Sequence, residues 1–350
     1  MRKRLISRIQ AEGPLPFEEF MRVALYGGDG GFFTGAVLRS EKAGDFLTSP
    51  EVSLMFGETL AGFVRIEADR IGVDTPVVVD AGAGSGSLLR PLLDALGPVG
   101  EVWAVEVSPA AGEALASRVP EASLVGGLDE IPSGMRGVIL ANELLDNLPA
   151  ALVVRTRGGW LEQQVGSADG DLILVEAPAR PAVAAWADSH GGPVPEGGRV
   201  EVQIGACEWV GRAIGLLGAG ALVAIDYGDT AEGLISRRPE GTLRTYRAHH
   251  LGPDPLLEPG ATDITMDVNF TAIQAAAEAA GAEVSLHRQD DFLTGLGLRD
   301  RLAALRDREL ELAREGTPME RLQARSDLGD GRTLLHPRGL GDFRVLVARV

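Results

Sequence analysis

Residues 77–86 read VVVDAGAGSG, and this stretch decides the fold. Its apolar run is of strand type and ends at Asp80, and alternating glycines follow at Gly82, Gly84 and Gly86. A helical pattern continues from the last glycine. Glycines at such a turn allow a tight bend and let a ligand approach the backbone. The stretch therefore predicts a strand, a ligand-binding turn and a helix in succession.

The spacing of these glycines indicates which ligand the turn binds. A dinucleotide-binding turn reads G-x-G-x-x-G, but Ser87 stands where the third glycine would be. Glu106 ends the next apolar run, 20 residues after Gly86, and a carboxylate there can accept hydrogen bonds from both ribose hydroxyls. The pattern favours S-adenosylmethionine (SAM), which has no pyrophosphate, over NAD. The alternative is a turn that only packs a helix on a sheet, with Glu106 as a solvated strand end.

Apolar strand patterns alternate with helical patterns along the chain. The strand patterns lie at 77–80, 102–106, 138–141 and 221–226, and the helical patterns at 87–96, 109–117 and 203–217. Such alternation is typical of a parallel sheet with right-handed crossovers. Continuous apolar strands indicate a sheet covered on both faces. We predict an α/β fold: a Rossmann-like class I methyltransferase core with an N-terminal helical cap and an inserted substrate-binding region.

The chain divides into three predicted segments. Residues 1–75 form the helical cap and a loop, to which the family resemblance described below assigns the role of covering SAM. Residues 76–226 form the SAM-binding core, with a hairpin region inserted at 150–200. Residues 227–350 supply substrate-region loops, helices and the closing strands of the same core, and a charged helical stretch spans 298–325.

A third strand end carries candidate acceptor-binding residues. The run at 138–141 leads into Asn142 and Glu143, with Asp146 close behind. Ligands bind outside the carboxyl ends of strands in open α/β sheets. If the segment is helical, Glu143 and Asp146 share a face, and two carboxylates suit a guanidinium or can hold an attacking nitrogen. Alternatively, Asn142 caps the helix and both acids are ordinary first-turn residues.

Two further segments are candidates for the acceptor side of the site. Asp226-Tyr227-Gly228 follows the strand at 221–226 and either lines an acceptor channel or only ends the strand. His249 is a candidate proton acceptor, because imidazole titrates near neutral pH. The alternative is a loop histidine that bonds to backbone.

Composition excludes several classes of function. The 350 residues carry a formal charge of −17, which disfavours nucleic acid as a ligand. Cys207 is the one cysteine, so there is no internal disulfide, and a reducing cytoplasm is expected. The five histidines lack metal-ligand spacing, so no metal is expected. We expect no secretory signal, since the basic start lacks an apolar region, and no membrane span, since the longest apolar run has 13 residues, 213–225.

Several separate segments resemble the MidA family, also described as the complex I assembly factor arginine methyltransferases. The matching segments are FMRVALYGGDGGFF at 20–33, GDFLTSPEVSLMFGE at 44–58, NELLDNLP at 142–149, GTLRTYRAH at 241–249 and DITMDVNF at 263–270. Their number and order make the resemblance more specific than any one motif.

The resemblance implies a SAM-dependent methyltransferase with a Rossmann-like core. A mitochondrial relative methylates an arginine on a core subunit of respiratory complex I, so a protein substrate is implied as well. In the second matching segment Asp45, Thr48, Ser49 and Glu51 would close over SAM, and Pro50 would occupy the first position of a short helix.

The sequence departs from the family pattern at Asp267 and Asn269, which replace a histidine and an aspartate, and at Phe32 and Phe33, which replace tyrosines. The first pair bears on arginine specificity if the replaced residues touch substrate.

Three functions remain open at this stage. The chain is an enzyme that methylates protein arginine, a methyltransferase for a small metabolite or peptide natural product, or a SAM-binding assembly factor that acts by protein contact. Glu143, Asp146 and His249 are the candidate catalytic residues. A homodimer is compatible with the sequence.

Overall fold

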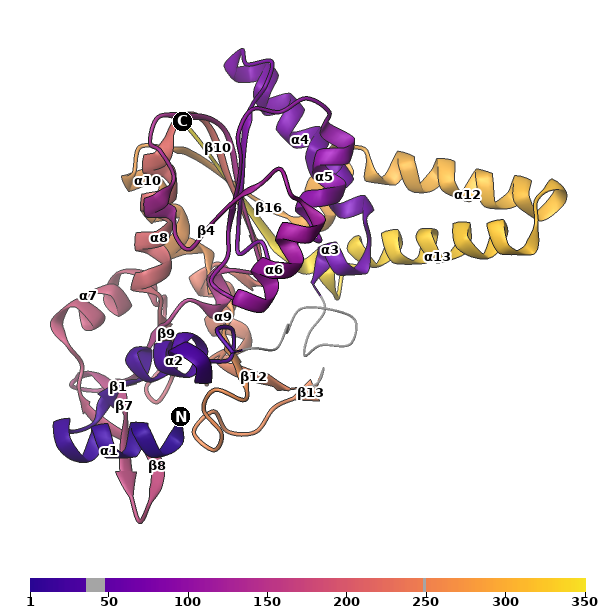
Figure 1. The fold of residues 1–350 in the computed structure, drawn as a ribbon. Coiled ribbons are helices and arrows are strands. Elements are labelled where there is room, and N and C mark those ends of the chain that lie inside the picture. Colours follow the sequence, from indigo (N-terminus) through magenta and orange to yellow (C-terminus); the bar gives the residue numbers. More distant parts are fainter. Residues whose placement is uncertain (36–47, 248–249) are drawn as a thin grey trace.

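The computed structural model describes residues 1–35, 48–247 and 250–350. It is an α/β structure built on a seven-stranded sheet (Figure 1). In spatial order the strands are β16 (Glu283–Arg288), β17 (Arg344–Arg349), β10 (Leu217–Asp226), β5 (Met135–Asn142), β2 (Val77–Ala81), β3 (Val102–Val105) and β4 (Ser123–Val125). β17 runs antiparallel to β16 and β10, and the other neighbouring strands of this sheet are parallel. The predicted Rossmann-like α/β core is confirmed.

Helices bury both faces of this sheet, as the continuous apolar strands predicted. Alternate residues of one strand face opposite sides: Val78 packs in one apolar core and Val79 in the other. The first core contains side chains of α4 (Met55–Ile71), α5 (Leu89–Leu96), α6 (Pro109–Arg118) and α11 (Gln289–Gly295). The second contains side chains of α8 (Ile204–Leu216) and α10 (Phe270–Ala279).

The N-terminal segment packs on the predicted insertion. Its elements are α1 (Arg2–Glu12), β1 (Leu15–Pro16), α2 (Phe17–Tyr26) and the 3-10 turn η1 (Gly28–Gly30). The insertion contains β6 (Ala151–Thr156), β7 (Gly159–Ala168), β8 (Asp171–Pro178), α7 (Pro181–His190) and β9 (Arg199–Val202). β1 pairs with β7, and Arg180 forms an ion pair with Glu18 at 3.0 Å. Residues 1–26 therefore form one layer with the insertion, which lies beside the core (Figure 1).

Residues 227–350 also supply small elements beside the sheet. These are β11 (Gly228–Asp229), α9 (Ala231–Arg237), β12 (Arg244–Arg247), β13 (His250–Leu251), β14 (Asp263–Thr265), β15 (Val268–Asn269) and the 3-10 turn η4 (Leu340–Asp342). β12 pairs with β13 and β14, and β11 pairs with β15. They lie on the side of the core from which the predicted acceptor residues come.

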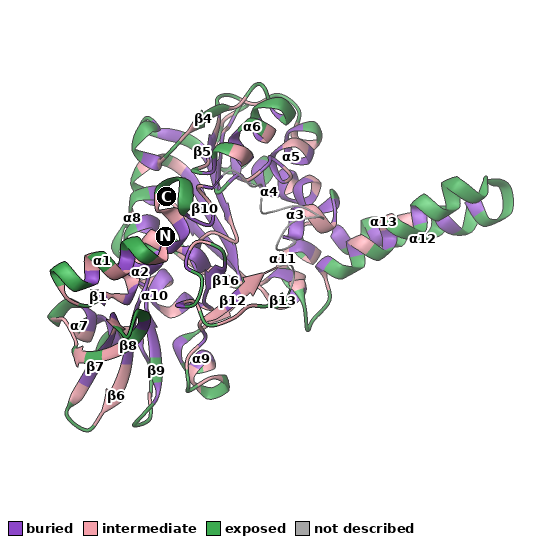
Figure 2. Cartoon of the chain, turned by 60° about the horizontal axis from the view of Figure 1, so that its bottom comes forward, coloured by how far each residue is buried: buried purple, intermediate pink, exposed green. Residues whose placement is uncertain are grey.

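The charged helical stretch predicted at 298–325 is two helices, α12 (Leu298–Glu315) and α13 (Pro318–Leu334). The chain turns at Gly316, and Thr317 then caps α13 in a capping box with Glu320. The two helices form an arm that projects from the core, and much of its surface is exposed (Figures 1 and 2). The sequence indicated the helical pattern but not this reversal.

None of the helices in the described ranges is both long enough and apolar enough to cross a membrane.

Candidate active site

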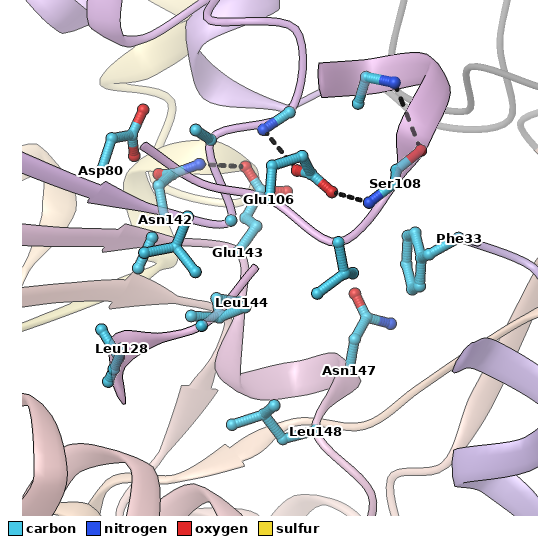
Figure 3. Close-up of a pocket in the computed structure, with 18 of the residues that line it drawn as sticks. Phe33, Asp80, Glu106, Ser108, Leu128, Asn142, Glu143, Leu144, Asn147 and Leu148 are labelled. Atoms are coloured by element: carbon cyan, nitrogen blue, oxygen red, sulfur yellow. Dashed lines mark hydrogen bonds between the residues drawn. The ribbon is translucent and has the colours of Figure 1, made fainter. Parts of the chain in front are cut away.

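A pocket of about 330 Å³ lies at the carboxyl ends of β2, β3 and β5 (Figure 3). Eight of the predicted site residues line it: Thr48, Pro50, Asp80, Gly82, Gly84, Glu106, Asn142 and Glu143. Ser49, Glu51 and Gly86 do not line this pocket but lie next to residues that do. Asp146 lines a second cavity. Asp45 and His249 lie outside the described residues. Most of the residues selected from the sequence therefore lie together at the carboxyl ends of the strands, where ligands are expected to bind in open α/β sheets.

The three glycines of the turn have different roles. All adopt positive φ, +74° at Gly82, +53° at Gly84 and +77° at Gly86, a region that favours glycine. A Cβ on Gly86 would lie 3.1 Å from Val119, so this glycine lets the turn pack against α6 and its end. A Cβ on Gly84 would meet no atom of the described chain within 4 Å. Gly84 therefore keeps space open for a ligand.

Glu106 fastens the glycine turn to the start of α6. Its Oε2 accepts the Gly84 N–H at 2.8 Å, and its Oε1 accepts the Ser108 N–H at 2.6 Å. A carboxylate has about four lone-pair positions, so two remain for the pocket. Burial raises the pKa of Glu106. The predicted ribose contact stays a prediction, and the structural role of this carboxylate was not foreseen.

The end of β5 holds Glu143 in an unusual backbone conformation. Its φ is +51°, and its N–H donates to the Ile225 carbonyl at 2.8 Å. The side-chain Oε1 accepts the Ser49 N–H at 3.1 Å and the Asn142 amide at 3.2 Å. Left-handed backbone at a non-glycine residue is costly and is found preferentially at functional sites.

The expectation that Glu143 and Asp146 share a helical face is wrong. The left-handed residue interrupts the chain, and only a 3-10 turn, η3 (Leu145–Asn147), follows. Asp146 instead accepts hydrogen bonds from the hydroxyls of Tyr227 and Thr265. Asn142 is the last residue of β5 and not a helix cap. The two carboxylates still belong to one site, because both line the second cavity.

This second cavity, of about 540 Å³, adjoins the first pocket. Glu143 and Asn147 line both, so the two spaces meet at these residues. Tyr227 and Gly228 line the second cavity, which favours the acceptor-channel interpretation of that segment. Asp226 is buried behind them, and its Oδ2 accepts the N–H groups of Leu145 at 3.0 Å and Asp146 at 3.2 Å. Asp226 thus positions the turn that carries both candidate acids.

Four acids with raised pKa values gather at the site. Burial, with the charge of Glu106, raises the pKa of Asp80 to about 7. Burial is also the main cause that raises the pKa of Glu143 to about 8 and the pKa values of Asp146 and Asp226. Within the described ranges no cationic side chain pairs with any of these four carboxyl groups. Such a site favours a positively charged ligand, which would stabilise the ionised acids.

Three buried oxygen atoms of residues that line the two cavities lack a hydrogen-bond partner within the described ranges: Asp80 Oδ2, Asn142 Oδ1 and Asp146 Oδ1. Buried polar atoms are normally paired, so each points to a missing ligand group or water. The first two line the glycine-turn pocket and the third belongs to a residue of the second cavity. The residues present therefore fit a polar, cationic ligand such as SAM in the first pocket.

The segment after Thr48 forms the predicted short helix, α3 (Ser49–Val52). The expectation that Pro50 is its first residue is wrong by one position, because the helix begins at Ser49. Thr48 and Glu51 form a capping box, with the Thr48 N–H 3.0 Å from Glu51 Oε2. Glu51 therefore stabilises the helix, while the Ser49 N–H donates to Glu143. Thr48 and Pro50 line the pocket itself.

Asp267 and Asn269, which depart from the family pattern, have separate roles. Asn269 caps α10 by accepting the Ala272 N–H at 3.2 Å, and it donates to the His190 carbonyl at 2.8 Å. It therefore does not touch the acceptor cavity. Asp267 lines that cavity and forms an ion pair with Arg244.

Several pocket residues were not selected from the sequence. Phe33 and Tyr26 stack with their ring centroids 5.6 Å apart and form one wall. Leu128 and Asp129, in the turn η2 (Leu128–Glu130), form another. The strand-end rule applied to β4 would have found the second pair. The first pair comes from the N-terminal layer, which no local pattern places here.

A glycine turn at the carboxyl ends of parallel strands, facing acids and unpaired polar atoms, defines a class I methyltransferase site. The chain belongs to a family described as S-adenosyl-L-methionine-dependent methyltransferases, whose sequence model matches residues 60–287. It is a SAM-dependent methyltransferase.

Named relatives and solved structures agree with this assignment. The chain is 28% identical to human "Protein arginine methyltransferase NDUFAF7, mitochondrial", over 89% of this chain and 76% of that protein. It is 29% identical to the Drosophila melanogaster homologue, over 80% and 70%. A crystal structure of a Burkholderia thailandensis protein bound to S-adenosyl-homocysteine matches with a TM-score of 0.87 and 29% identity, over 100% of this chain and 91% of that chain.

Replacing Gly84 by alanine tests the cofactor pocket. A Cβ at Gly84 enters space that the described chain leaves empty, so we expect SAM affinity to fall at least about tenfold (~1.4 kcal/mol). Gly72→Ala is the matched control, because Gly72 has φ +64°, also has open space around it, and lies at the end of α4 outside the pocket lining. Calorimetric titration with SAM measures both. Equal SAM affinity in the two variants would count against the pocket assignment.

The raised pKa of Glu143 predicts a pH-dependent gain of stability in Glu143→Gln. The folded protein keeps a proton that the unfolded chain loses above its ordinary pKa of 4.5, so this group's stabilisation is lost as pH rises toward about 8. Glutamine does not titrate. The free energy of unfolding of the variant, relative to wild type without ligand, should therefore rise by about 1.4 kcal/mol per pH unit between those values.

Urea unfolding from pH 5 to 8 measures this difference. Glu176→Gln is the control, since Glu176 is exposed on β8 and outside both cavities. Parallel stability curves for wild type and Glu143→Gln would refute the burial of an unpaired acid at this position.

Proposed function

We propose that this chain transfers a methyl group from SAM to a guanidinium nitrogen of arginine in a protein. The observation that carries the proposal is the position of Glu143, whose carboxylate lines both the glycine-turn pocket and the second cavity. A group bound in the second cavity at Glu143 lies next to the cofactor pocket. Relatives that bear the name protein arginine methyltransferase support the choice of acceptor.

The inner end of the second cavity suits a guanidinium. Asp146 is buried there and Glu143 is half-buried, and neither has a cationic partner within the described residues. Asp146 Oδ1 is an unpaired acceptor. A planar guanidinium offers five N–H donors and stays charged at all physiological pH values. It would stabilise both ionised acids and satisfy this oxygen.

Bound SAM supplies a methyl group on positively charged sulfur, which is already activated for displacement. The chain contributes position, exclusion of water and a proton acceptor. Both hydrogen bonds to Glu143 end on Oε1, so Oε2 is available to the acceptor nitrogen. With a pKa raised toward neutrality, Glu143 can bind the guanidinium and take up the proton that the methylated nitrogen releases. Tyr227 and Thr265 hold Asp146, and Asp226 holds the turn.

Two alternatives remain useful for interpreting an experiment. A cavity of about 540 Å³ is also large enough for a small metabolite. A SAM-binding assembly factor would use the fold without transfer. Cytoplasm stays the proposed location on the basis of the single cysteine, and cell fractionation decides it.

Glu143→Gln tests the proposed reaction. We expect methyl transfer to fall by about 10²-fold or more, because the variant loses both the charge and the proton acceptor. SAM affinity should stay within about threefold of wild type. The assay incubates purified protein with lysate of the source organism and SAM carrying a labelled methyl group. Label should be recovered as methylarginine in a protein.

Gly84→Ala and Glu176→Gln are the controls for this assay: the first should lose transfer with SAM binding, and the second should keep both. Label found only in small molecules would support the metabolite alternative. Full transfer by Glu143→Gln would contradict the proposed role of this carboxylate.

A further inference from the structure

Four arginines line the second cavity, an unusual number beside so many acids in a chain of net charge −17. Two of them have partners. Arg244 forms an ion pair with Asp267 and lies over the Tyr227 ring. Arg237 donates to Asp229 at 2.8 Å. These two arginines are held by the cavity wall itself.

Arg238 and Arg338 are different. Within residues 1–35, 48–247 and 250–350, neither guanidinium has an ion-pair or hydrogen-bond partner, although both line the cavity. The chain has 50 acidic residues for 33 basic ones, so acidic partners are not scarce. Arg238 follows α9, and Arg338 precedes η4, 100 positions later in the sequence. Only the fold brings them to one space.

The charged groups of the cavity that lack an ion-pair partner within the described residues differ in exposure. Asp146 is buried and Glu143 is half-buried, whereas Arg238 is half-buried and Arg338 is exposed. A ligand that satisfies both ends has a cation that goes in first and an anion that stays near the opening. Arginine side chains bind carboxylates through paired, charge-assisted hydrogen bonds.

We propose that Arg238 and Arg338 are specificity-determining residues that bind a carboxylate next to the acceptor guanidinium. The inference rests on the proposed function and narrows its substrate class to an arginine that carries a neighbouring carboxylate. That carboxylate has two sources, an acidic side chain beside the arginine in a protein or the α-carboxylate of arginine itself. The overall charge of −17 repels acidic peptides, so a preference for them must come from local cations.

The inference is tested by calorimetry at low salt. The experiment measures the binding of four synthetic probes to the protein in the presence of S-adenosyl-homocysteine. Acetyl-Glu-Arg-Glu-amide is compared with acetyl-Gln-Arg-Gln-amide, and Nα-acetyl-arginine with agmatine. We expect the carboxylate-bearing member of at least one pair to bind about tenfold more tightly. The first pair reports an acidic side chain, and the second reports the α-carboxylate.

The double variant Arg238→Gln/Arg338→Gln should lose this preference and still bind the neutral probe of that pair as wild type does. Arg306→Gln is the matched control, since Arg306 is exposed on α12 and lines neither cavity. Its preference for the carboxylate-bearing probe should equal that of the wild type. The control Arg306→Gln/Arg314→Gln changes the net charge as much as Arg238→Gln/Arg338→Gln does, and it should also keep the wild-type preference.

Each outcome decides the inference. Equal affinities within both pairs, or a preference that survives in the double variant, would overturn it. If the inference fails in this way but Glu143→Gln abolishes the binding of all probes, the proposed function stands and only the carboxylate-binding role of the two arginines is lost. If no guanidinium probe binds to wild type, both the inference and the proposed function fail.

Discussion

The site depends on one constraint: the half-buried Glu143 is held at the end of β5 with left-handed backbone. The Ser49 N–H and the Asn142 amide fix its Oε1, and Asp226 fixes the turn that follows. This arrangement places one carboxylate on the wall that the cofactor pocket shares with the second cavity. The backbone strain and the burial of an unpaired acid both cost stability, and both are features found preferentially at functional sites.

The same electrostatic argument links the cofactor, the acceptor and the specificity proposal. Asp80, Glu143 and Asp146 have no cationic partners within the described residues, which favours a cation on each side of Glu143. A sulfonium in one space and a guanidinium in the other would both be positively charged, so the acids between them would be ionised when both are bound. The unpaired Arg238 and Arg338 provide the complementary positive end, farther from the reacting atoms.

Local patterns predicted the core because its strands and the glycine turn are determined by nearby residues. The apolar run before Asp80 and the positive-φ glycines after it are examples. The expectation that Glu143 and Asp146 share a helical face was wrong because residues distant in the sequence fix this segment. The Ile225 carbonyl accepts the Glu143 N–H, and Asp226 accepts the N–H groups of Leu145 and Asp146. The capping box at Thr317 and Glu320 was present in the sequence and could have divided the arm into two helices. No local signal brings Arg238 and Arg338 together.

Proton release on ligand binding tests the account most directly. SAM carries a positive sulfur and S-adenosyl-homocysteine does not, while the rest of the two molecules is alike. Calorimetry at pH 7 in buffers of different ionisation enthalpy measures the protons released by each. The account predicts a larger release with SAM than with S-adenosyl-homocysteine, and a smaller difference between the ligands in Glu143→Gln. Equal release with both ligands in the wild-type protein would contradict it.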